Sequence, residues 1–587
     1  MRFLSGRSTP GLTDVCVFAV AIGLVTGIGA VGFRLLIGLI HNLMFLGQWA
    51  WTYDANLHTP ASPWGPLVIL VPVLGGLVVT FLVVNFAPEA RGHGVPEVMD
   101  SIYYREGRIR PMVAAVKSLA SAFSIGSGAS VGREGPIIQI GASLGSTFGQ
   151  LLPVEAWQRI TLVAAGAGAG IAATFNTPIG GVMFAVELLM PEVSARTFLP
   201  VALATGTATF IGRIFLGTQP AFHVPMPTDD GAPSIVLLCL FAILGLLMGV
   251  AATAFVRGLH WAELTFGRIR SSYLRHIVGM LGMGVLIYGL QRAFGHYFVA
   301  GVGYATIQDI LAGQTDLPAL LFLLWACKLL ATSVSLGSGA SGGIFSPSLF
   351  MGATLGGAFG ALLARVAPGL PISVPAFAMV GMAAMVGGAS GAALTAVIMI
   401  FEMTRSYDIV MPMIVAVALS IGVRRLLSRE NIYTIKLVGR RHFIPKAMHA
   451  NMFLVRHASD IMERDVVVLP HDAPLDAFLR DQQGAALKHI VVRRDDRICG
   501  VLRINTGLRR GRSHVGLTLG EVAQTNYTIA RADDAAFDVI KRLWRRNGAM
   551  AVVVEGPGRP RAGAVIGVIT KEHIADSVAD TVKSYAA

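Results

Sequence analysis

Charged residues and cysteines are scarce in this sequence. Only 14% of the 587 residues are charged, whereas an ordinary soluble domain has about 25%. The 4 cysteines are scattered, three of them inside apolar runs, which excludes a disulfide scaffold and a cysteine-based metal site. Hydrophobic residues make up 54% of the chain. So large an apolar excess cannot be buried in a water-soluble core, and it indicates an integral membrane protein in contact with the lipid bilayer.

Basic runs interleaved with aromatic residues, which nucleic-acid-binding proteins use to follow a phosphate backbone, are missing although the net charge is +13. Positive loops on the inner side of a membrane explain this charge better. Arg2 and Arg7 precede a long apolar segment, and no small-residue cleavage site follows at the distance that a signal peptide needs. We therefore expect a multi-pass protein of the cell inner (plasma) membrane, with both termini in the cytoplasm and no nucleic-acid partner.

Several apolar stretches before residue 440 are too short or too glycine-rich to cross a bilayer alone. Glycine accounts for 68 residues, and small residues let helix backbones approach closely in lipid. Broken helices occur at membrane depth only where irregular backbone is buried in protein or lines a cavity. The pattern predicts a helical transport domain over residues 1–442, because the composition changes sharply near Arg440 and Arg441.

An internal repeat is the most informative feature. Residues 126–136 read GSGASVGREGP and residues 337–347 read GSGASGGIFSP, at an offset of 337 − 126 = 211 residues. Residues 171–187 also run in parallel with residues 386–402. The membrane domain is therefore expected to consist of two halves, about 12–215 and 232–438. Glycine-rich breaks at matching places predict a substrate site at the interface between the repeats.

Each glycine-rich break leads into a helix through a proline, Pro136 in one half and Pro347 in the other. Proline is tolerated in a first helical turn, and the glycines before it are expected to leave backbone N–H groups uncovered. Free N–H groups at the positive end of a helix dipole bind an anion without a full positive charge. Nucleotide binding, which the G-x-G-x-x-G of residues 337–342 formally allows, lacks a preceding strand and a Gly-Lys-Ser/Thr sequence.

Glu134 is the acidic residue within these breaks. An ionisable group at membrane depth is costly and marks function by default. Its carboxylate is suited to occupy the anion site and to withdraw when it is protonated, so it would act as both plug and proton carrier. The alternative is a structural ion pair with Arg133.

Beyond the membrane domain, short β-rich runs alternate with amphipathic helices. A linker over residues 443–457 leads to a first unit at 458–510 and a second at 517–580. Each unit has the order strand, helix, strand, strand, helix, and such units associate as a pair.

These features together resemble the CLC family of chloride channels and chloride/proton antiporters with C-terminal CBS domains. The resemblance is carried by Gly92-His-Gly-Val-Pro96, Gly132-Arg-Glu-Gly-Pro136, Gly343-Ile-Phe-Ser-Pro347, Tyr433 and the paired C-terminal units. It implies an all-α polytopic membrane domain of two inverted-topology repeats with broken helices, plus an α/β cytoplasmic CBS pair. It also implies a homodimer with a pore in each subunit, which transports chloride or another small anion, with protons in the antiporters, and which is not an enzyme.

The resemblance also implies roles for single residues. Glu134 corresponds to the external gating glutamate, the Ile344 and Phe345 backbone N–H groups to donors for the central anion, and the Tyr433 hydroxyl to another donor. The anion-binding candidates are His93, Gly132, Arg133, Gly343, Ile344, Phe345 and Tyr433. Lys117, Arg133 and Lys328 raise the local potential for anions, or alternatively are surface cations.

Two positions depart from the family pattern. His93 stands where the family usually has Ser, so either the imidazole donates to the anion or it points away and leaves binding to the backbone. Leu188 stands where the antiporters carry an internal proton-accepting glutamate, while Glu187 matches the preceding structural glutamate. Leucine cannot relay a proton, which favours a channel-like or weakly coupled protein. The alternative is an antiporter with a substitute internal proton path.

The tail departs as well. Family CBS pairs that bind adenine nucleotides use a Thr and an Asp three residues later. Here Thr570 is followed by His573, and Arg503 and Thr506 replace the first pair. Adenine-nucleotide binding at Thr570 and a purely structural tail both stay open, and we predict no other cofactor and no metal.

Two rivals come from other classes. A membrane-anchored enzyme using Glu134 or Glu187 as acid or base lacks the residue clusters for catalysis. A CBS-containing magnesium transporter would need carboxylates along its path, whereas the glycine-rich breaks carry only Glu134.

Overall fold

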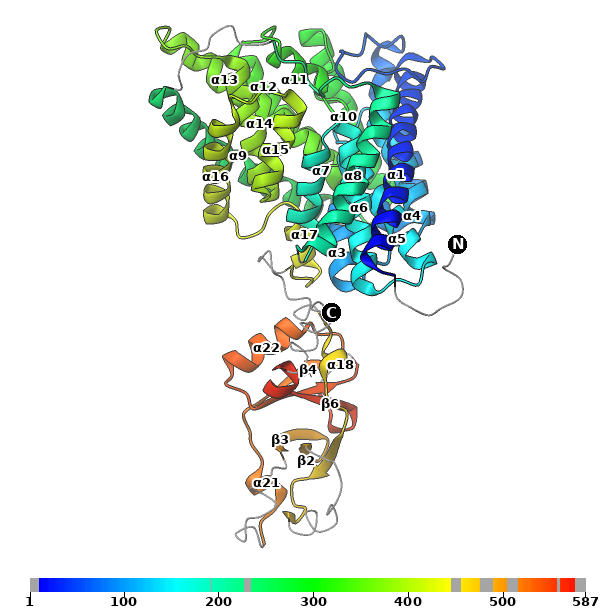
Figure 1. The fold of residues 1–587 in the computed structure, drawn as a ribbon, viewed down its shortest axis with the longest axis vertical. Helices are drawn as coiled ribbons and strands as arrows, with labels where there is room; N and C mark the ends of the chain where they lie inside the picture. Colours follow the sequence, from blue (N-terminus) through cyan, green and yellow to red (C-terminus); the bar gives the residue numbers. More distant parts are fainter. Residues whose placement is uncertain are drawn as a thin grey trace. The chain divides into compact units, whose positions relative to one another are not determined.

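The computed structural model describes residues 10–191, 193–225, 234–444, 456–475, 489–503, 516–556 and 560–575. The chain forms two compact units, Met1–Phe443 and Ile444–Ala587 (Figure 1). The first unit is helical, and the second contains two small sheets. Each unit is described by itself below.

The helices of the first unit fall into two series. The first series is α1 (Leu12–His41), α2 (Val71–Asn85), α3 (Val95–Tyr104), α4 (Met112–Gly126), α5 (Glu134–Leu151), α6 (Ala156–Phe175), α7 (Pro178–Phe184) and α8 (Ala195–Leu216). The second is α9 (Ile235–Gly267), α10 (Ser272–Phe294), α11 (Tyr304–Leu311), α12 (Pro318–Ser338), α13 (Phe345–Val366), α14 (Val374–Ser390), α15 (Ala393–Thr404), α16 (Val410–Leu427) and α17 (Thr434–Gly439). Within the described residues, eight helical segments are long and apolar enough to cross a membrane.

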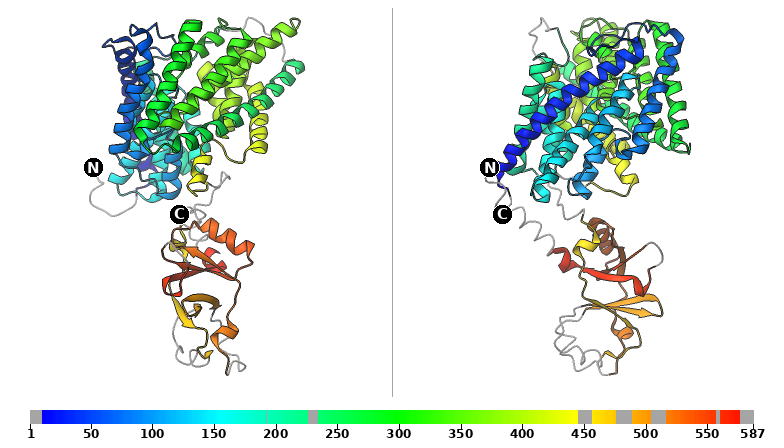
Figure 2. Two further views of the ribbon diagram at one scale, coloured as in Figure 1. Left: turned by 180° about the vertical axis from the view of Figure 1, so that it is seen from behind. Right: turned by 90° about the vertical axis from the view of Figure 1, so that its right-hand side faces the viewer.

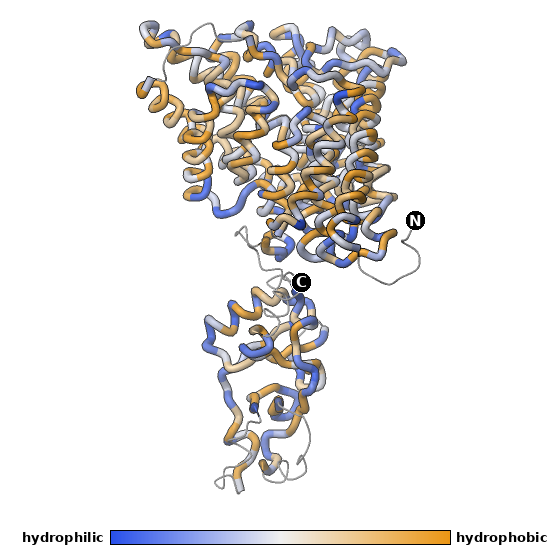
Figure 3. Tube along the Cα trace, in the orientation of Figure 1, coloured by the Kyte–Doolittle hydropathy of each residue, from blue (hydrophilic) through white to orange (hydrophobic). Residues whose placement is uncertain are grey.

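The two series pack in the same way. Helix α5 packs on α6 as α13 packs on α14, and α1 packs on α8 as α9 packs on α16. The long helices run side by side through the unit (Figure 2), and most of their residues are hydrophobic (Figure 3). The duplicated helical membrane domain that the sequence predicts is therefore present, including short helices such as α3, α7, α11 and α15 that do not span a bilayer alone.

Glycine pairs explain how the central helices approach so closely. A Cβ atom at Gly141 would lie 2.1 Å from the Gly166 carbonyl oxygen, and one at Gly166 equally close to the Gly141 oxygen. In the second half, Gly352 and Gly381 face each other in the same way, at 2.5 and 2.4 Å. Neither contact has room for a side chain. Close backbone packing of this kind replaces the hydrophobic effect in holding helices together within lipid.

The second unit contains two sheets of identical topology. The first has strands β1 (Val466–Pro470), β2 (His489–Arg494) and β3 (Arg497–Arg503), and the second has β4 (Tyr527–Arg531), β5 (Met550–Val554) and β6 (Val565–Thr570). In each sheet the first two strands are parallel and the last two antiparallel. The described helices are α18 (Ala458–Ile461), α21 (Leu519–Val522) and α22 (Ala536–Arg545).

One buried cluster contains Val491 and Val501 from the first sheet together with Val552 and Val568 from the second. The two sheets therefore share a core, as the sequence predicts for a pair of units. Residues 445–455 of the predicted linker lie outside the described residues, as do residues 476–488, 504–510, 557–559 and 576–580 of the two predicted units.

Candidate functional site

The two glycine-rich breaks pair with each other. The Gly132 N–H donates to the Gly343 carbonyl oxygen at 2.7 Å, and the Gly343 N–H donates to the Gly132 oxygen at 2.6 Å. This finding corrects the expectation that both glycines offer free N–H groups to an anion, because each amide already has an acceptor. The bridge instead fixes the N-termini of α5 and α13 beside each other.

A third segment meets the two breaks at Gly135. A Cβ atom there would lie 2.2 Å from the His93 carbonyl oxygen and 2.8 Å from the Gly343 Cα atom. His93 lies directly before α3, so the start of α3 reaches the same point as the starts of α5 and α13. Three helix N-termini therefore surround one small volume, and the electrostatics there favour negative charge.

The Glu134 carboxylate occupies this volume. Its Oε1 atom accepts from the Tyr304 hydroxyl at 2.5 Å and from the Ser346 hydroxyl, and its Oε2 atom accepts from the Ser346 backbone N–H at 3.2 Å. The side chain is 1% exposed, and Oε2 lies 2.2 Å from the place of a Cβ atom on Gly132. Among the described residues no ion pair joins Glu134 to Arg133. The carboxylate is thus bound at the N-terminus of α13 in the manner of an anion.

The next donors along this N-terminus are open. Within the described residues, neither the Ile344 N–H nor the Phe345 N–H has a protein acceptor, although Ile344 and Phe345 are both buried. The first N–H groups of a helix have no partner inside the helix. These two amides are therefore suited to bind an anion next to the place that Glu134 fills.

Tyr304 is a site residue that sequence reasoning missed. Its hydroxyl reaches Glu134 and also lies 2.7 Å from the Ser346 Oγ atom. It follows the sequence Gly301-Val-Gly303, which matches the Gly92-His-Gly94 sequence of the first half at an offset of 301 − 92 = 209 residues. That second G-x-G sequence is the signal that would have located it.

Two buried lysines hold these G-x-G loops. Lys117 donates from Nζ to the carbonyl oxygens of Ala90 and Gly92, at 2.9 and 2.7 Å. Lys328 donates in the same way to Val299 and Gly301, at 3.0 and 2.9 Å. Both lysines are 0% exposed, so they are not surface cations. They fix the loops before α3 and α11 and place positive charge beneath them.

His93 and Tyr433 lie together. Their ring centroids are 6.0 Å apart, and both side chains are buried. The His93 Nδ1 atom has no hydrogen-bond partner within the described part of the chain. Tyr433 is placed by Asn431, whose Oδ1 atom accepts from the N–H groups of Tyr433 and Thr434 at 2.9 and 2.8 Å. The cap fixes the backbone at the start of α17, where the Tyr433 ring lies near the His93 ring.

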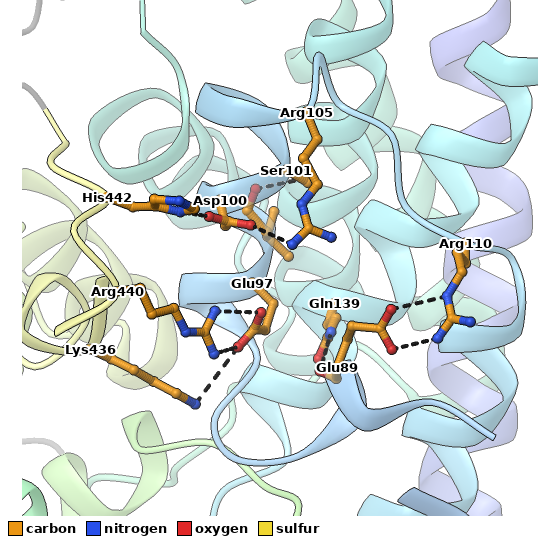
Figure 4. A network of polar contacts seen from close by, with 11 residues as sticks. Glu89, Glu97, Asp100, Ser101, Arg105, Arg110, Gln139, Lys436, Arg440 and His442 are labelled. Carbon is orange, nitrogen blue, oxygen red and sulfur yellow. Dashed lines mark hydrogen bonds and ion pairs between the residues drawn. The ribbon is translucent and has the colours of Figure 1, made fainter. Parts of the chain in front are cut away.

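A charged network joins α3 to α17 and to the segment that follows it (Figure 4). Glu97 accepts two hydrogen bonds from Arg440, at 3.0 and 2.6 Å, and lies 3.8 Å from the Lys436 ammonium. One turn further, Asp100 contacts both His442 and Arg105. An adjoining cavity of about 570 Å³ is lined by Arg91, Glu97, Glu263, Arg275, Lys436 and Arg440, among others. The network ties α17, which begins next to Tyr433, to α3, which begins next to His93.

Glu187 has a structural position. Its carboxylate accepts from the backbone N–H groups of Leu394 and Thr395, at 3.2 and 2.8 Å, at the start of α15. In the other half, Glu402 accepts from the N–H groups of Ile179 and Gly180, at 3.1 and 2.7 Å, at the start of α7. Each glutamate therefore caps a helix of the opposite half. Leu188 follows in a half-buried π-helical turn, Ala185–Leu189, and brings no titratable group.

Thr570, the candidate nucleotide-binding residue in the tail, forms hydrogen bonds with a neighbouring residue. The Thr570 hydroxyl accepts from the His573 N–H at 3.3 Å, so it caps the residues after β6. Nearby, Arg503 forms two hydrogen bonds with Glu572, which hold the pKa of that carboxyl below its ordinary value. Thr506 lies outside the described residues. Adenine-nucleotide binding at Thr570 therefore stays a prediction. In the described residues no group of three metal-ligating side chains comes together.

Comparison with protein-family models identifies the membrane unit. The model described as voltage gated chloride channel matches residues 75–425, and the CBS domain model matches residues 458–508. The chain belongs to the voltage-gated chloride channel (CLC) family. Members of this family are channels or transporters, so the prediction that the chain is not an enzyme is confirmed, as is the multi-pass membrane character.

Individual relatives agree with this assignment. The chain is 32% identical over 423 residues to the H(+)/Cl(-) exchange transporter ClcA of Citrobacter koseri, covering 70% of this chain and 85% of the relative. It is 31% identical over 452 residues to the chloride channel protein CLC-f of Arabidopsis thaliana, covering 71% of this chain but only about half (54%) of that relative.

Among solved structures, a slow cyanobacterial Cl−/H+ antiporter matches with a TM-score of 0.64 and 26% identity, covering 74% of this chain and 99% of that one. A eukaryotic CLC transporter matches with a TM-score of 0.61 at 20% identity, over 95% of this chain and 97% of that one. The predicted fold, an inverted-repeat helical membrane domain followed by an α/β CBS region, is therefore confirmed.

Proposed function

We propose that this protein transports chloride and related small anions through a path gated by Glu134, with weak or no coupling to protons. The observation that carries the proposal is the Glu134 carboxylate, hydrogen-bonded by Tyr304 and Ser346 at the N-terminus of α13. A site that binds a carboxylate through backbone and hydroxyl donors also suits a small anion. Relatives named as chloride channels or H(+)/Cl(-) exchangers support chloride as the ion.

Protonation releases the gate in this proposal. A carboxylate accepts charge-assisted hydrogen bonds, which are roughly twice as strong as those of a neutral acid. A protonated Glu134 therefore holds its place less tightly and exchanges with an anion, which takes the Ser346 N–H and the open Ile344 and Phe345 N–H groups. The anion then leaves readily because no full positive charge contacts it.

The remaining site residues have supporting roles in the proposal. His93 and Tyr433 bind the anion as it passes the start of α3, and Arg133 raises the potential near Glu134. Gly132 and Gly343 hold the two breaks together without touching the ion, as their bridge supports.

Weak coupling follows from Leu188. A proton that enters from the cytoplasm needs a titratable group to carry it across a region where an isolated charge costs several kcal/mol. Leu188 supplies none, and Glu187 is committed to capping α15. The alternative is an antiporter with a substitute proton path, which the exchanger names of the relatives favour.

The cellular setting is part of the proposal. It comprises a homodimer in the inner (plasma) membrane, both termini in the cytoplasm, the membrane domain over 1–442, and a CBS pair over 458–510 and 517–580. The shared core of the two sheets supports the pairing.

The decisive experiment replaces Glu134 with Gln. Chloride flux from liposomes should persist or rise, and its dependence on pH should disappear, because the neutral amide mimics the protonated gate. Loss of flux in a variant that folds and assembles normally would disprove the gating role. Voltage measured under separate chloride and proton gradients then distinguishes a channel from an exchanger.

A further inference from the structure

A second cavity lies close to Glu134 and is lined by an excess of positive charge. Its volume is about 180 Å³, and the described residues that line it include Arg34, Arg133 and Arg213, with Asp54 as the one acid among them. Tyr304 and Asn176 also line it, so the tyrosine that binds Glu134 forms part of the wall. Three arginines around one small space give an excess of two positive charges.

No ion pair to these arginines is present in the part of the chain that the structure describes. Within the described residues, neither the three guanidinium groups nor Asp54 takes part in an ion pair. Arg213 donates from Nε to the neutral Asn176 Oδ1 atom at 2.6 Å, which holds its side chain in place without balancing its charge. Asp54 accepts a hydrogen bond from the Asn56 N–H at 3.0 Å.

Arg133 is the most telling member of the group. It is 9% exposed, and its buried Nε atom has no hydrogen-bond partner in the described part of the chain. Its guanidinium carbon lies 5.1 Å from the centre of the Tyr304 ring and 5.6 Å from that of Phe175, and both rings also line the cavity. A buried guanidinium with an unused donor is costly unless an acceptor satisfies it.

We infer that this cavity is a second anion site, separate from the one at the N-terminus of α13 and built from guanidinium groups in place of backbone amides. The inference rests on the proposed anion transport, because it places a waiting position beside the gate. Its ligands are small anions, with planar oxyanions such as nitrate preferred over halides, because a guanidinium fork matches two oxygens of a planar anion.

The site differs from the gate in what it selects. The α13 site offers amide donors that suit a spherical ion, whereas the cavity offers fixed charges and paired donors. An anion in the cavity would take the unused Arg133 donor and lie against Tyr304, next to Glu134. Anions arriving on this face would therefore be concentrated before the gate opens.

Bromide located by its anomalous scattering in crystals of the Glu134→Gln variant tests the site directly. Bromide both at the N-terminus of α13 and among the three arginines would support the inference. Bromide at α13 alone would overturn the second site and leave the proposed function standing. Absence of bromide from α13 would instead overturn the proposed function.

Flux measurements on otherwise unmodified protein give an independent test. In oriented liposomes, Arg34→Gln should raise the half-saturating chloride concentration on the cavity face by about three- to tenfold, as loss of one charge-assisted contact at a partly exposed site implies. Asp54→Asn should lower it, since the opposing negative charge is removed. On the other face of the membrane, the half-saturating chloride concentration should be the same in both variants as in the unmodified protein.

Arg292→Gln is the matched control, since it removes one exposed positive charge from α10 that does not line the cavity. An equal effect of Arg34→Gln and Arg292→Gln would mean that only general surface charge matters, and it would overturn the site. A rise in the half-saturating chloride concentration with Asp54→Asn would also overturn the site.

Discussion

The hydroxyl of Tyr304 allows a sharp test of how the gate is held. Replacing Tyr304 with Phe keeps the ring beneath Arg133 and removes the donor that lies 2.5 Å from the Glu134 Oε1 atom. A hydrogen bond to a charged group contributes about 1.5–3 kcal/mol. Ser346 keeps its two contacts with the carboxylate, so we expect the lower value, about 1.5 kcal/mol.

A change of this size shifts the balance between the seated and the released carboxylate about tenfold, since about 1.4 kcal/mol corresponds to a factor of ten. Chloride flux at neutral pH should therefore rise by up to about tenfold. The further increase on acidification should shrink, because less of the gate remains seated. Stopped-flow chloride efflux from liposomes at pH 7 and pH 4.5 measures both effects.

Tyr297→Phe is the matched control. The Tyr297 hydroxyl is also buried, but it accepts from the Ser62 N–H at 3.0 Å and does not reach Glu134. The control should keep the ordinary flux and pH response. If Tyr304→Phe behaved like Tyr297→Phe, the hydroxyl would not stabilise the seated carboxylate, and the account of the gate would be wrong.

Three further outcomes are expected. His93→Ser should shift selectivity among chloride, nitrate and fluoride toward chloride by about 1–2 kcal/mol, as for one charge-assisted hydrogen bond; an unchanged series in reversal potentials from pH 5 to 8 would show that the imidazole does not face the ion. A chloride gradient should drive little uphill proton movement into liposomes, and Leu188→Glu should increase it; robust pumping by the unmodified protein would restore the antiporter alternative. In the tail, the lowered pKa of Glu572 beside Arg503 means that the pair stabilises the folded state above the ordinary carboxyl pKa of about 4.3 and loses this effect as the pH falls through the folded value. Because the pair is exposed the effect should be small, and hydrogen exchange of the β3 amides at pH 7 and pH 4 in wild type and Arg503→Gln should detect it.

The repeat and the place of Glu134 at the start of α5 were predictable because they depend on local sequence. A glycine-rich break, a proline and a single acid within eleven residues define the start of α5 without knowledge of the rest of the chain. The matching motif in the second half then predicts that the two breaks meet.

The partners of Glu134 were not predictable in this way. Tyr304 lies 170 residues away and Ser346 lies 212 residues away, so their hydrogen bonds depend on how the two halves pack. The same packing explains why the expectation of free N–H groups at Gly132 and Gly343 was wrong, since the acceptor of each amide lies in the opposite half. Sequence spacing identifies donors, but tertiary structure decides which donors are already used.

The crossed caps of α7 and α15 have a consequence for biosynthesis. The first N–H groups of α7 find their carboxylate only at Glu402, 222 residues downstream of Gly180. During translation the first half therefore enters the membrane while the first N–H groups of α7 have no acceptor. These groups gain their acceptor only after nearly the whole membrane domain, up to Glu402, has been synthesised. Separately expressed halves should be short-lived alone and should rescue each other when they are produced in the same cell.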